Sequence, residues 1–313
     1  MPDAPTPREV GPDAPAPGGP GLRAAVLEWF DENARDLPWR APDRTPWGVL
    51  VSEVMLQQTP VVRVEPAWRA WMARWPEPAD LAAAGTADVL RAWDRLGYPR
   101  RALRLQECAR VVVERHDGTV PRTTEELLAL PGVGAYTAAA VQAFAFGLRS
   151  VVLDTNVRRV LARSVGGTAL PAPSQTTAEV RLAASYVPDD DATAARWSAA
   201  SMELGALVCT ARSPRCEECP VAGLCAWRAA GRPDDEHAAR RRTQAWAGTD
   251  RQVRGRVMAL LREALEPVPA HALDAVWPDR TQRERCVAGL LADGLVVRVP
   301  GPSDDDPPTY RLP

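Results

Sequence analysis

The sequence predicts an all-α region over residues 21–230 and a small α+β module over residues 251–313. Two observations predict the helical region: apolar residues recur at helical spacing between breaks at Pro, Gly and Asp, and long alternating β patterns are scarce. In the module, residues 251–265, 271–277 and 281–291 have helical patterns, and residues 295–299 and 310–312 are suited to pair as two strands. Three short helices with a small hairpin are typical of a winged-helix module.

Two polar segments separate these regions from the rest of the chain. Residues 1–20 contain seven prolines and almost no large apolar residues, so we expect a disordered tail. Residues 231–250 begin with a polar, charge-dense stretch and are predicted to form a linker. The predicted organisation is therefore a tail, a helical region, a linker and a terminal module.

The composition is that of an ordinary globular protein. Of the 313 residues, 46% are hydrophobic and 25% are charged, and the formal net charge is −2, which argues against a strongly basic nucleic-acid-binding domain. Local arginine clusters can still hold phosphates, although solvated helix faces explain them equally well. No apolar run reaches the about 18 residues of a membrane span, and no signal-peptide pattern is present, so we expect a cytoplasmic protein. The arginine clusters are Arg95, Arg100, Arg101 and Arg104, and Arg158, Arg159 and Arg163.

Four of the six cysteines are crowded into seventeen residues, as Cys-x6-Cys-x2-Cys-x5-Cys. Such crowding favours metal ligation over disulfides in a reducing compartment. Thiolates are ligands for both zinc and iron–sulfur clusters, so both remain open. Structural zinc more often uses two close pairs separated by a longer loop, and the even spacing therefore favours an iron–sulfur cluster. The four residues are Cys209, Cys216, Cys219 and Cys225.

A glycine-rich segment, Leu130-Pro-Gly-Val-Gly-Ala-Tyr-Thr137, lies between two helical patterns. Gly132 and Gly134 permit a tight turn with positive φ that aims backbone N–H groups outward at a helix N-terminus. Such a turn binds phosphate oxygens without reading bases. An ordinary connection between two helices is the alternative.

A carboxylate interrupts the apolar segment Ser52-Glu-Val-Met-Leu-Gln-Gln-Thr59. Helical spacing puts Glu53 and Gln57 on one face, with Gln58 beside them. Loss of hydration in apolar surroundings favours the protonated carboxyl, which can act as a general acid. A solvated or paired carboxylate is the alternative interpretation of Glu53.

A second carboxylate, Asp154, opens a helical pattern in Val151-Val-Leu-Asp-Thr-Asn-Val157. Aspartate is a common helix N-cap, so a purely structural role is an equally good explanation. One protonated and one ionised carboxyl are what cleavage of an N-glycosidic bond requires, in parallel with the glycosidases. The sequence by itself does not establish that Glu53 and Asp154 meet.

These motifs together resemble one family. The cysteine loop is similar to the 4Fe-4S loop of endonuclease III and MutY proteins, and residues 130–137 resemble the helix-hairpin-helix signature. Residues 52–59 closely match the MutY pattern. The resemblance covers residues 22–228 and implies an all-α helix-hairpin-helix DNA glycosylase fold with a 4Fe-4S cluster. It also implies a six-helix part with the hairpin, residues 47–149, and an iron–sulfur part, residues 21–46 and 150–230.

The resemblance assigns catalytic roles. Glu53 is expected to protonate an adenine, and Gln57 and Gln58, followed by Thr59, to contact the bases around the lesion. Asp154 is expected to stabilise the sugar cation after the base departs. Asn156 resembles a family residue that supports the site.

The resemblance also assigns recognition roles. Trp39 and Arg40 resemble residues that lie beside the extruded adenine. Leu96 and Tyr98, with Arg100 and Arg101 close behind, resemble a loop whose tyrosine wedges into the duplex beside an oxidised guanine.

The position after the hairpin distinguishes two activities. Gly132, Gly134 and Thr137 are expected to bind DNA backbone, and Tyr136 stands where endonuclease III has a lysine that attacks the sugar. The whole chain contains no lysine, and tyrosine forms no Schiff base. We therefore expect a glycosylase without lyase activity.

The implied substrate is double-stranded DNA with adenine opposite 8-oxoguanine or guanine, bound by a monomeric, nucleoid-associated enzyme. The family usually ends in a Nudix-like domain, and residues 251–313 are too short and too helical for one. Preference for oxidised guanine is then expected to depend on Gln58, Tyr98 and the terminal module. Two alternatives stay open: an endonuclease III-like glycosylase and lyase for oxidised pyrimidines, and a non-catalytic iron–sulfur DNA-binding regulator.

Overall fold

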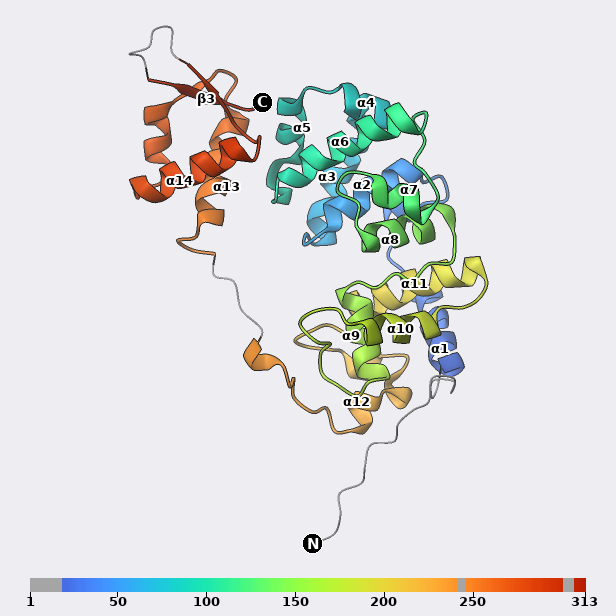
Figure 1. Ribbon diagram of the computed structural model, residues 1–313. Coiled ribbons are helices and arrows are strands. Elements are labelled where there is room, and N and C mark those ends of the chain that lie inside the picture. The colour runs from blue at the N-terminus through green and yellow to red at the C-terminus, as the bar shows by residue number, and fades with distance from the viewer. Residues whose placement is uncertain (1–18, 241–245, 301–306) are drawn as a thin grey trace. The chain divides into compact units, whose positions relative to one another are not determined.

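The computed structural model describes residues 19–240, 246–300 and 307–313. The predicted disordered tail lies outside these residues except for its last two, which begin α1 (Gly19–Asn33). The chain divides into two compact units (Figure 1). We call residues 1–35 and 147–241 the cysteine unit, and residues 36–146 and 242–313 the hairpin unit. No helix of the described residues has the length and apolar character needed to cross a bilayer.

The first part of the hairpin unit is built around α2 (Pro46–Leu56). Thr45 caps this helix by accepting a hydrogen bond from the Gly48 N–H at 3.0 Å, and Pro46 occupies its first position. Every residue from 47 to 55 is buried, because helices on several sides pack against α2. The other helices are α3 (Val61–Arg74), α4 (Pro78–Ala83), α5 (Thr86–Trp93), α6 (Arg100–Arg115), α7 (Thr124–Ala129) and α8 (Ala135–Phe146), with the short 3-10 helices η1 (Pro38–Arg40) and η2 (Asp94–Leu96).

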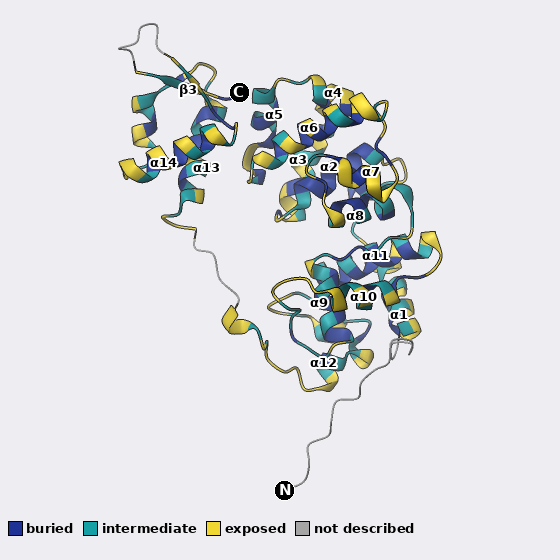
Figure 2. Ribbon diagram, in the orientation of Figure 1, coloured by how far each residue is buried: buried dark blue, intermediate teal, exposed yellow. Residues whose placement is uncertain are grey.

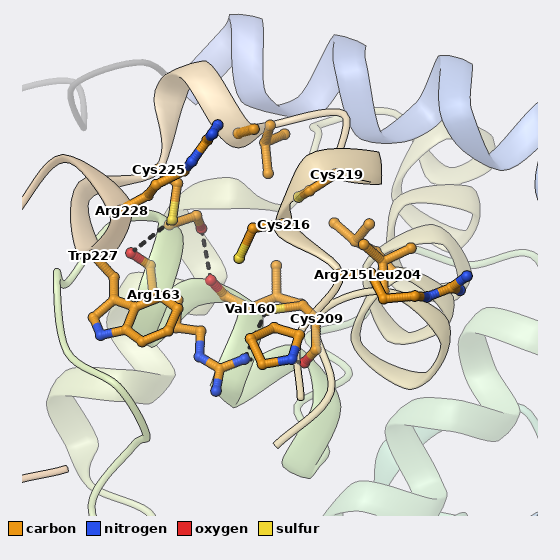
Figure 3. Close-up of a pocket in the computed structure, with 15 residues that line it drawn as sticks. Val160, Arg163, Leu204, Cys209, Arg215, Cys216, Cys219, Cys225, Trp227 and Arg228 are labelled. Atoms are coloured by element: carbon orange, nitrogen blue, oxygen red, sulfur yellow. Dashed lines mark hydrogen bonds between the residues drawn. The ribbon is translucent and has the colours of Figure 1, made fainter. Parts of the chain in front are cut away.

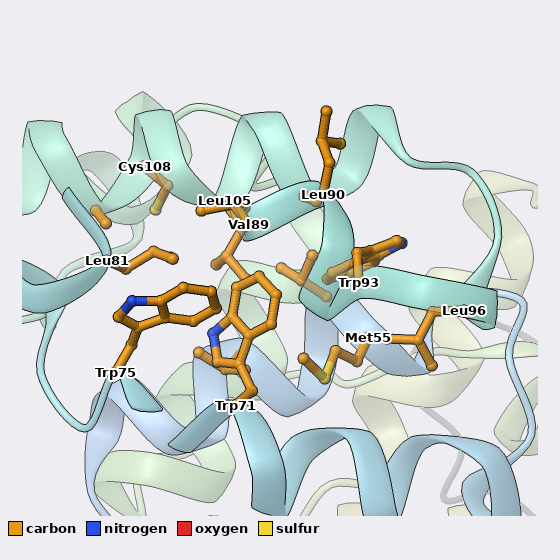
Figure 4. Packing of buried hydrophobic residues seen from close by; sticks show 14 of the residues in the cluster. Met55, Trp71, Trp75, Leu81, Val89, Leu90, Trp93, Leu96, Leu105 and Cys108 are labelled. Carbon is orange, nitrogen blue, oxygen red and sulfur yellow. The ribbon is translucent and has the colours of Figure 1, made fainter. Parts of the chain in front are cut away.

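Tryptophans fill the core between α2, α3 and α5 (Figure 4). Trp71 packs edge-on against Trp75, with ring centroids 4.6 Å apart, and against Trp93 at 5.6 Å. Met55 of α2 and Leu105 of α6 belong to the same core. Edge-to-face aromatic packing adds stabilisation beyond the burial of the apolar area itself.

The cysteine unit has a separate core. α1 and α9 (Thr155–Ser164) pack against α11 (Asp191–Leu207), and α10 (Thr177–Tyr186) packs against α9. Its largest fully buried side chains are Trp197 and Tyr186, whose rings stack 6.4 Å apart. Figure 2 shows buried residues on the helix faces that meet within the unit. After α11 come the 3-10 helices η3 (Cys216–Glu218) and η4 (Ala222–Leu224), then α12 (Ala226–Ala229) and η5 (Ala238–Arg240).

The C-terminal module, within the hairpin unit, contains α13 (Asp250–Glu263), η6 (Ala270–Ala275) and α14 (Arg280–Ala292). Three short strands form an antiparallel sheet in the order β1-β3-β2: β1 (Val268–Pro269), β2 (Val297–Val299) and β3 (Thr309–Arg311). The α+β class is as predicted. The first strand was not predicted. It forms because Val268, whose side chain is buried, pairs with Tyr310 of β3. The middle helix is a 3-10 turn that ends before Trp277, since Pro278 disfavours helical backbone at the preceding residue.

Trp71 should carry much of the stability of the hairpin unit, because its side chain is 1% exposed and contacts two further tryptophans. We expect Trp71→Ala to lower the free energy of unfolding by about 3–5 kcal/mol. Val62→Ala on the same helix is the matched control, since Val62 is 79% exposed. Urea unfolding followed by circular dichroism measures both, and equal midpoints for the two variants would contradict this packing.

Candidate active site

Glu53 lies on α2, in the run of buried residues from 47 to 55. Its side chain is 5% exposed, inside α2, between Ser52 and Val54, which are also buried. Burying a carboxyl group costs less free energy when the group is protonated than when it is ionised. The surroundings therefore suit a proton donor.

The 3-10 helix η1 contacts α2 and carries Trp39 and Arg40. Trp39 is buried and packs edge-on against Trp68, with the ring centroids 5.7 Å apart. The Trp68 Nε1–H in turn donates to the Gly48 carbonyl of α2 at 2.8 Å. Trp39 and Arg40 are thus fixed beside the helix that carries Glu53.

The end of α2 forms a tight turn. Gln57 is the C-cap, and Gln58 is exposed with a left-handed backbone of φ 55°. Thr59 is buried, and its hydroxyl donates to the Leu96 carbonyl at 3.2 Å. This bond joins the Gln57–Thr59 turn to the turn that carries Tyr98, whose own φ is 46°.

Arg101 holds the two turns together. Its Nη1 donates to the carbonyls of Val54 at 2.8 Å and Met55 at 3.1 Å, and to that of Gln57. Its Nη2 donates to the Thr59 hydroxyl at 3.1 Å and to the carbonyls of residues 96 and 97 at 3.0 and 3.1 Å. Burial lowers the pKa of Arg101 to about 10, so the guanidinium stays charged at neutral pH. The sequence marks Arg101 as one of an arginine cluster and as part of the loop that carries Tyr98, and no local signal predicts that it anchors both turns.

The glycine turn lies between α7 and α8. Gly132 has φ 80°, and a Cβ there would come within 3.1 Å of the Arg104 Cβ, so both the conformation and the space favour glycine. Gly132 thus has the positive φ that the sequence predicts for this turn. Gly134 leads directly into α8, where its carbonyl accepts the Ala138 N–H at 2.9 Å, so its backbone is set by the start of the helix. Tyr136 and the buried Thr137 are in the first turn of α8.

Asp154 is the N-cap of α9 in the cysteine unit. One carboxylate oxygen accepts the backbone N–H groups of Asn156 at 2.9 Å and Val157 at 2.7 Å, and the other accepts the Asn156 Nδ2 at 2.6 Å. Burial raises the pKa of Asp154, whereas these three hydrogen bonds and the charge of Arg159 act in the opposite direction. The hydrogen bonds fix both oxygens of this carboxylate in place.

Asn156 is itself held by a buried arginine. The Arg159 Nη2 donates to the Asn156 Oδ1 at 2.8 Å and to the Gly205 carbonyl at 2.7 Å. A Cβ on Gly205 would lie 2.6 Å from the Asn156 Cβ, so only glycine allows α11 to approach α9 this closely. The sequence predicts that Arg159 and Arg163 belong either to a phosphate-binding cluster or to a solvated helix face. Both alternatives are wrong, because both side chains are buried and donate to carbonyl groups.

All four cysteines of the loop line one cavity of about 400 Å³, together with Val160, Leu204 and Trp227 (Figure 3). Arg163, Arg215 and Arg228 also line this cavity. Thiols from residues 209, 216, 219 and 225 are the complete donor set of a four-iron cluster, so the residues present fit an iron–sulfur group.

Arg163 provides positive charge beside this cavity. Its Nη1 donates to the Cys209 Sγ at 3.4 Å, and its guanidinium stacks on Trp227 at 4.7 Å from the ring centroid. Burial raises the pKa of Cys209, which Arg163 opposes, and burial also raises the pKa of Cys219 to about 11. Because burial favours the neutral thiols, bound cations are needed to stabilise the thiolates that ligate a metal, and iron would supply them.

Replacing one cavity thiol should remove the cluster. We expect Cys216→Ala to reduce bound iron from about four per chain and to abolish the yellow-brown absorption of a 4Fe-4S protein. Cys108→Ala is the control, because Cys108 is buried in the core of the hairpin unit. Elemental analysis and the visible spectrum measure both variants. A colourless wild-type protein with stoichiometric zinc would contradict this assignment.

The residues predicted for the site are distributed over both units. The hairpin unit contains Glu53 with the Gln57–Thr59, Tyr98 and glycine turns, and the cysteine unit contains Asp154, Asn156 and the cysteine loop. The convergence of Glu53 and Asp154 on one base thus stays a prediction.

Comparison with known proteins gives the family. Residues 51–184 match the HhH-GPD superfamily of base excision DNA repair proteins, and residues 209–225 match the iron–sulfur binding domain of endonuclease III. An adenine DNA glycosylase of Mycolicibacterium smegmatis is 55% identical over 87% of this chain and 91% of its own length. One from Mycobacterium tuberculosis is 53% identical over 87% of this chain and 89% of its own.

The fold has a solved counterpart as well. The structure of a thermostable thymine-DNA glycosylase is similar, with a TM-score of 0.61 at 28% identity, over 68% of this chain and 98% of that one. The chain therefore belongs to the adenine DNA glycosylase family, within the helix-hairpin-helix superfamily of base excision repair proteins.

Proposed function

We propose that this protein is a monofunctional DNA glycosylase that hydrolyses the N-glycosidic bond of adenine opposite 8-oxoguanine or guanine. The observation that carries the proposal is Glu53, a carboxylic acid almost completely buried on α2. The two mycobacterial relatives described above are identical to this chain at more than half of their aligned residues. Both are adenine DNA glycosylases, which supports adenine as the base released.

The first step is protonation of the base. With adenine extruded from the helix, Glu53 transfers its proton to N7, and the electron pair of the N-glycosidic bond passes to the departing base. The Glu53 carboxyl suits this step, because burial removes the hydration that would stabilise its ionised form. Trp39 and Arg40, fixed next to α2, line the space for that base.

The second step leaves an oxocarbenium-like sugar, and Asp154 stabilises it as an anion. Three N–H donors hold both oxygens of Asp154 in place, so no reorganisation is needed as the positive charge develops. Asn156 and Arg159 position this carboxylate. Water then adds to C1′ of the sugar and loses a proton, which restores the Glu53 carboxyl, and the product is an abasic site.

The abasic product stays uncut because Tyr136 offers no amine to attack the sugar and the chain has no lysine. This feature argues against an endonuclease III-like lyase. The buried acid and the fixed carboxylate argue against a non-catalytic regulator, which needs neither.

DNA contacts are assigned to the turns that surround these groups. The backbone N–H groups near Gly132 and Gly134 bind phosphate at the start of α8, with Thr137 in its first turn. Gln57, Gln58 and Tyr98 contact the base pairs at the lesion, supported by Leu96, Thr59 and Arg100 in the same two turns.

The iron–sulfur cluster has a structural role in this proposal. Cys209, Cys216, Cys219 and Cys225 would hold it, and when bound it orders the loop between α11 and α12. All proposed catalytic residues come from one chain, so we infer a monomer that acts on DNA in the nucleoid.

Glu53→Gln should abolish adenine release while leaving DNA binding intact. An amide keeps the shape of the side chain and has no acidic proton, so we expect single-turnover base release to fall by about 10²–10⁴. Glu65→Gln on α3 is the control, because Glu65 forms a surface ion pair with Arg69 at 3.0 Å. The proposal fails if the Glu53→Gln protein releases adenine at the wild-type rate.

Asn156→Leu should change the pH dependence of base release. Asp154 must be ionised, so the rate is full above its pKa and is lost as the pH falls through that pKa. The Asn156 Nδ2 is one of the donors that lower the pKa of Asp154, and leucine has a similar size without the donor. We expect the acidic limb of the single-turnover rate profile to move to higher pH. An unchanged limb, or a move to lower pH, would refute this role.

A further inference from the structure

A buried ion pair holds the chain at the point where it leaves the cysteine unit. Glu203 of α11 has a completely buried side chain, and it pairs with Arg35, the last residue before the chain enters the hairpin unit. The catalytic steps above use neither residue. Apolar side chains would fill the same space without the desolvation of two charges, so the ion pair indicates a role besides packing.

The carboxylate fixes both the backbone and the side chain of Arg35. The Glu203 Oε1 accepts the backbone N–H of Arg35 at 3.0 Å and its Nε–H at 2.7 Å, and the Oε2 accepts the Nη2–H at 2.8 Å. The two bonds to the guanidinium define the relative orientation of the two groups, which a lysine ammonium does not reproduce. The third bond holds the peptide group of residue 35. Arg35 is thus fixed in direction as well as in position.

The segment that follows Arg35 is short and restrained. Three residues separate Arg35 from Trp39. Of these, Leu37 is buried, and the ring of Pro38 restricts its own φ to about −65°. The Leu37 carbonyl accepts the Arg40 N–H at 2.8 Å, which begins η1. A displacement at Arg35 is therefore transmitted to Trp39 and Arg40, which are proposed to line the space for the base.

The same turn of α11 also holds the segment that contains Asp154. Gly205 lies two residues after Glu203, and its carbonyl accepts the Arg159 Nη2–H at 2.7 Å. Residues two apart in a helix differ by about 200° in direction, so Glu203 and Gly205 face nearly opposite sides of α11. α11 accordingly contacts both α1, which ends shortly before Arg35, and α9, which begins directly after Asp154 (Figure 1).

We propose that Glu203 is a positioning residue for base release, which acts through Arg35 to fix the segment that leads to Trp39 and Arg40. One turn of α11 then holds both this segment and the hydrogen-bond network around Asp154. The inference rests on the proposed function, which places Trp39 and Arg40 beside the extruded adenine.

Two variants of the full chain test this role. Glu203→Gln keeps the shape of the side chain and removes its charge. Arg35→Lys keeps a cation beside the buried carboxylate, which protects the fold, and loses the paired hydrogen bonds. Asp31→Asn is the matched control, because Asp31 of α1 forms an ion pair with Arg196 of α11 and both of these residues are exposed.

The first measurement is amide hydrogen exchange of the free protein, followed by mass spectrometry of a peptide that covers residues 35–41. Loss of hydrogen bonds to a charged group makes local opening easier, so we expect about tenfold faster exchange in this peptide for both variants. Asp31→Asn should exchange at the wild-type rate. This measurement needs neither DNA nor catalysis.

The second measurement is single-turnover release of adenine from a duplex with adenine opposite 8-oxoguanine. We expect the rate constant to fall by about 10–100-fold in both variants at full amplitude, because the base is held less precisely. A merely structural defect would instead lower the amplitude, which counts active molecules, and leave the rate constant unchanged. Asp31→Asn should match the wild type in both quantities.

Wild-type exchange in both variants would overturn the inference, and so would a loss of amplitude at the wild-type rate constant. A wild-type protein that releases no adenine would remove the proposed function. Faster exchange in the two variants would then still show that Glu203 fixes this segment, so the two failures are distinguishable.

Discussion

The C-terminal end of α2 has peptide carbonyls that no helical N–H can satisfy, and Arg101 supplies the donors they need. The same guanidinium satisfies the carbonyls of the turn before Tyr98. Because one side chain serves both, the two turns proposed to meet the lesion cannot move independently of each other or of the helix that carries Glu53. Left-handed backbone at Gln58 and Tyr98 is maintained by this shared anchor.

The two carboxyl groups of the proposed mechanism lie in different surroundings. Glu53 is buried among the packed helices of the hairpin unit. Asp154 is also buried, which raises its pKa, while three N–H donors and the neighbouring Arg159 act against that rise. In the proposed mechanism, burial suits Glu53 to donate a proton, and the hydrogen bonds at a helix N-terminus hold the Asp154 carboxylate in position. In the cysteine unit, Arg163 similarly uses a buried charge to support thiolates at the cavity.

Local patterns predicted much of this structure. Helical periodicity predicted the all-α region, and the spacing of four cysteines predicted an iron–sulfur loop, because ligands close in sequence must also be close in space. What escaped prediction depends on contacts between distant residues. Arg101 donates to carbonyls more than forty residues away in the sequence, and Arg159 donates to the carbonyl of Gly205. The residues next to these arginines in the sequence therefore do not indicate their roles. Val268 forms a strand only because Tyr310 pairs with it.

The central claim is that Glu53 and Asp154 act on opposite ends of one N-glycosidic bond. A crystal structure of the Glu53→Gln protein with a duplex that contains adenine opposite 8-oxoguanine measures this most directly. The account predicts an extruded adenine with residue 53 within hydrogen-bond distance of N7 and an Asp154 oxygen against the sugar C1′. An adenine that remains stacked in the duplex, or side chains 53 and 154 that face separate pockets, would contradict it.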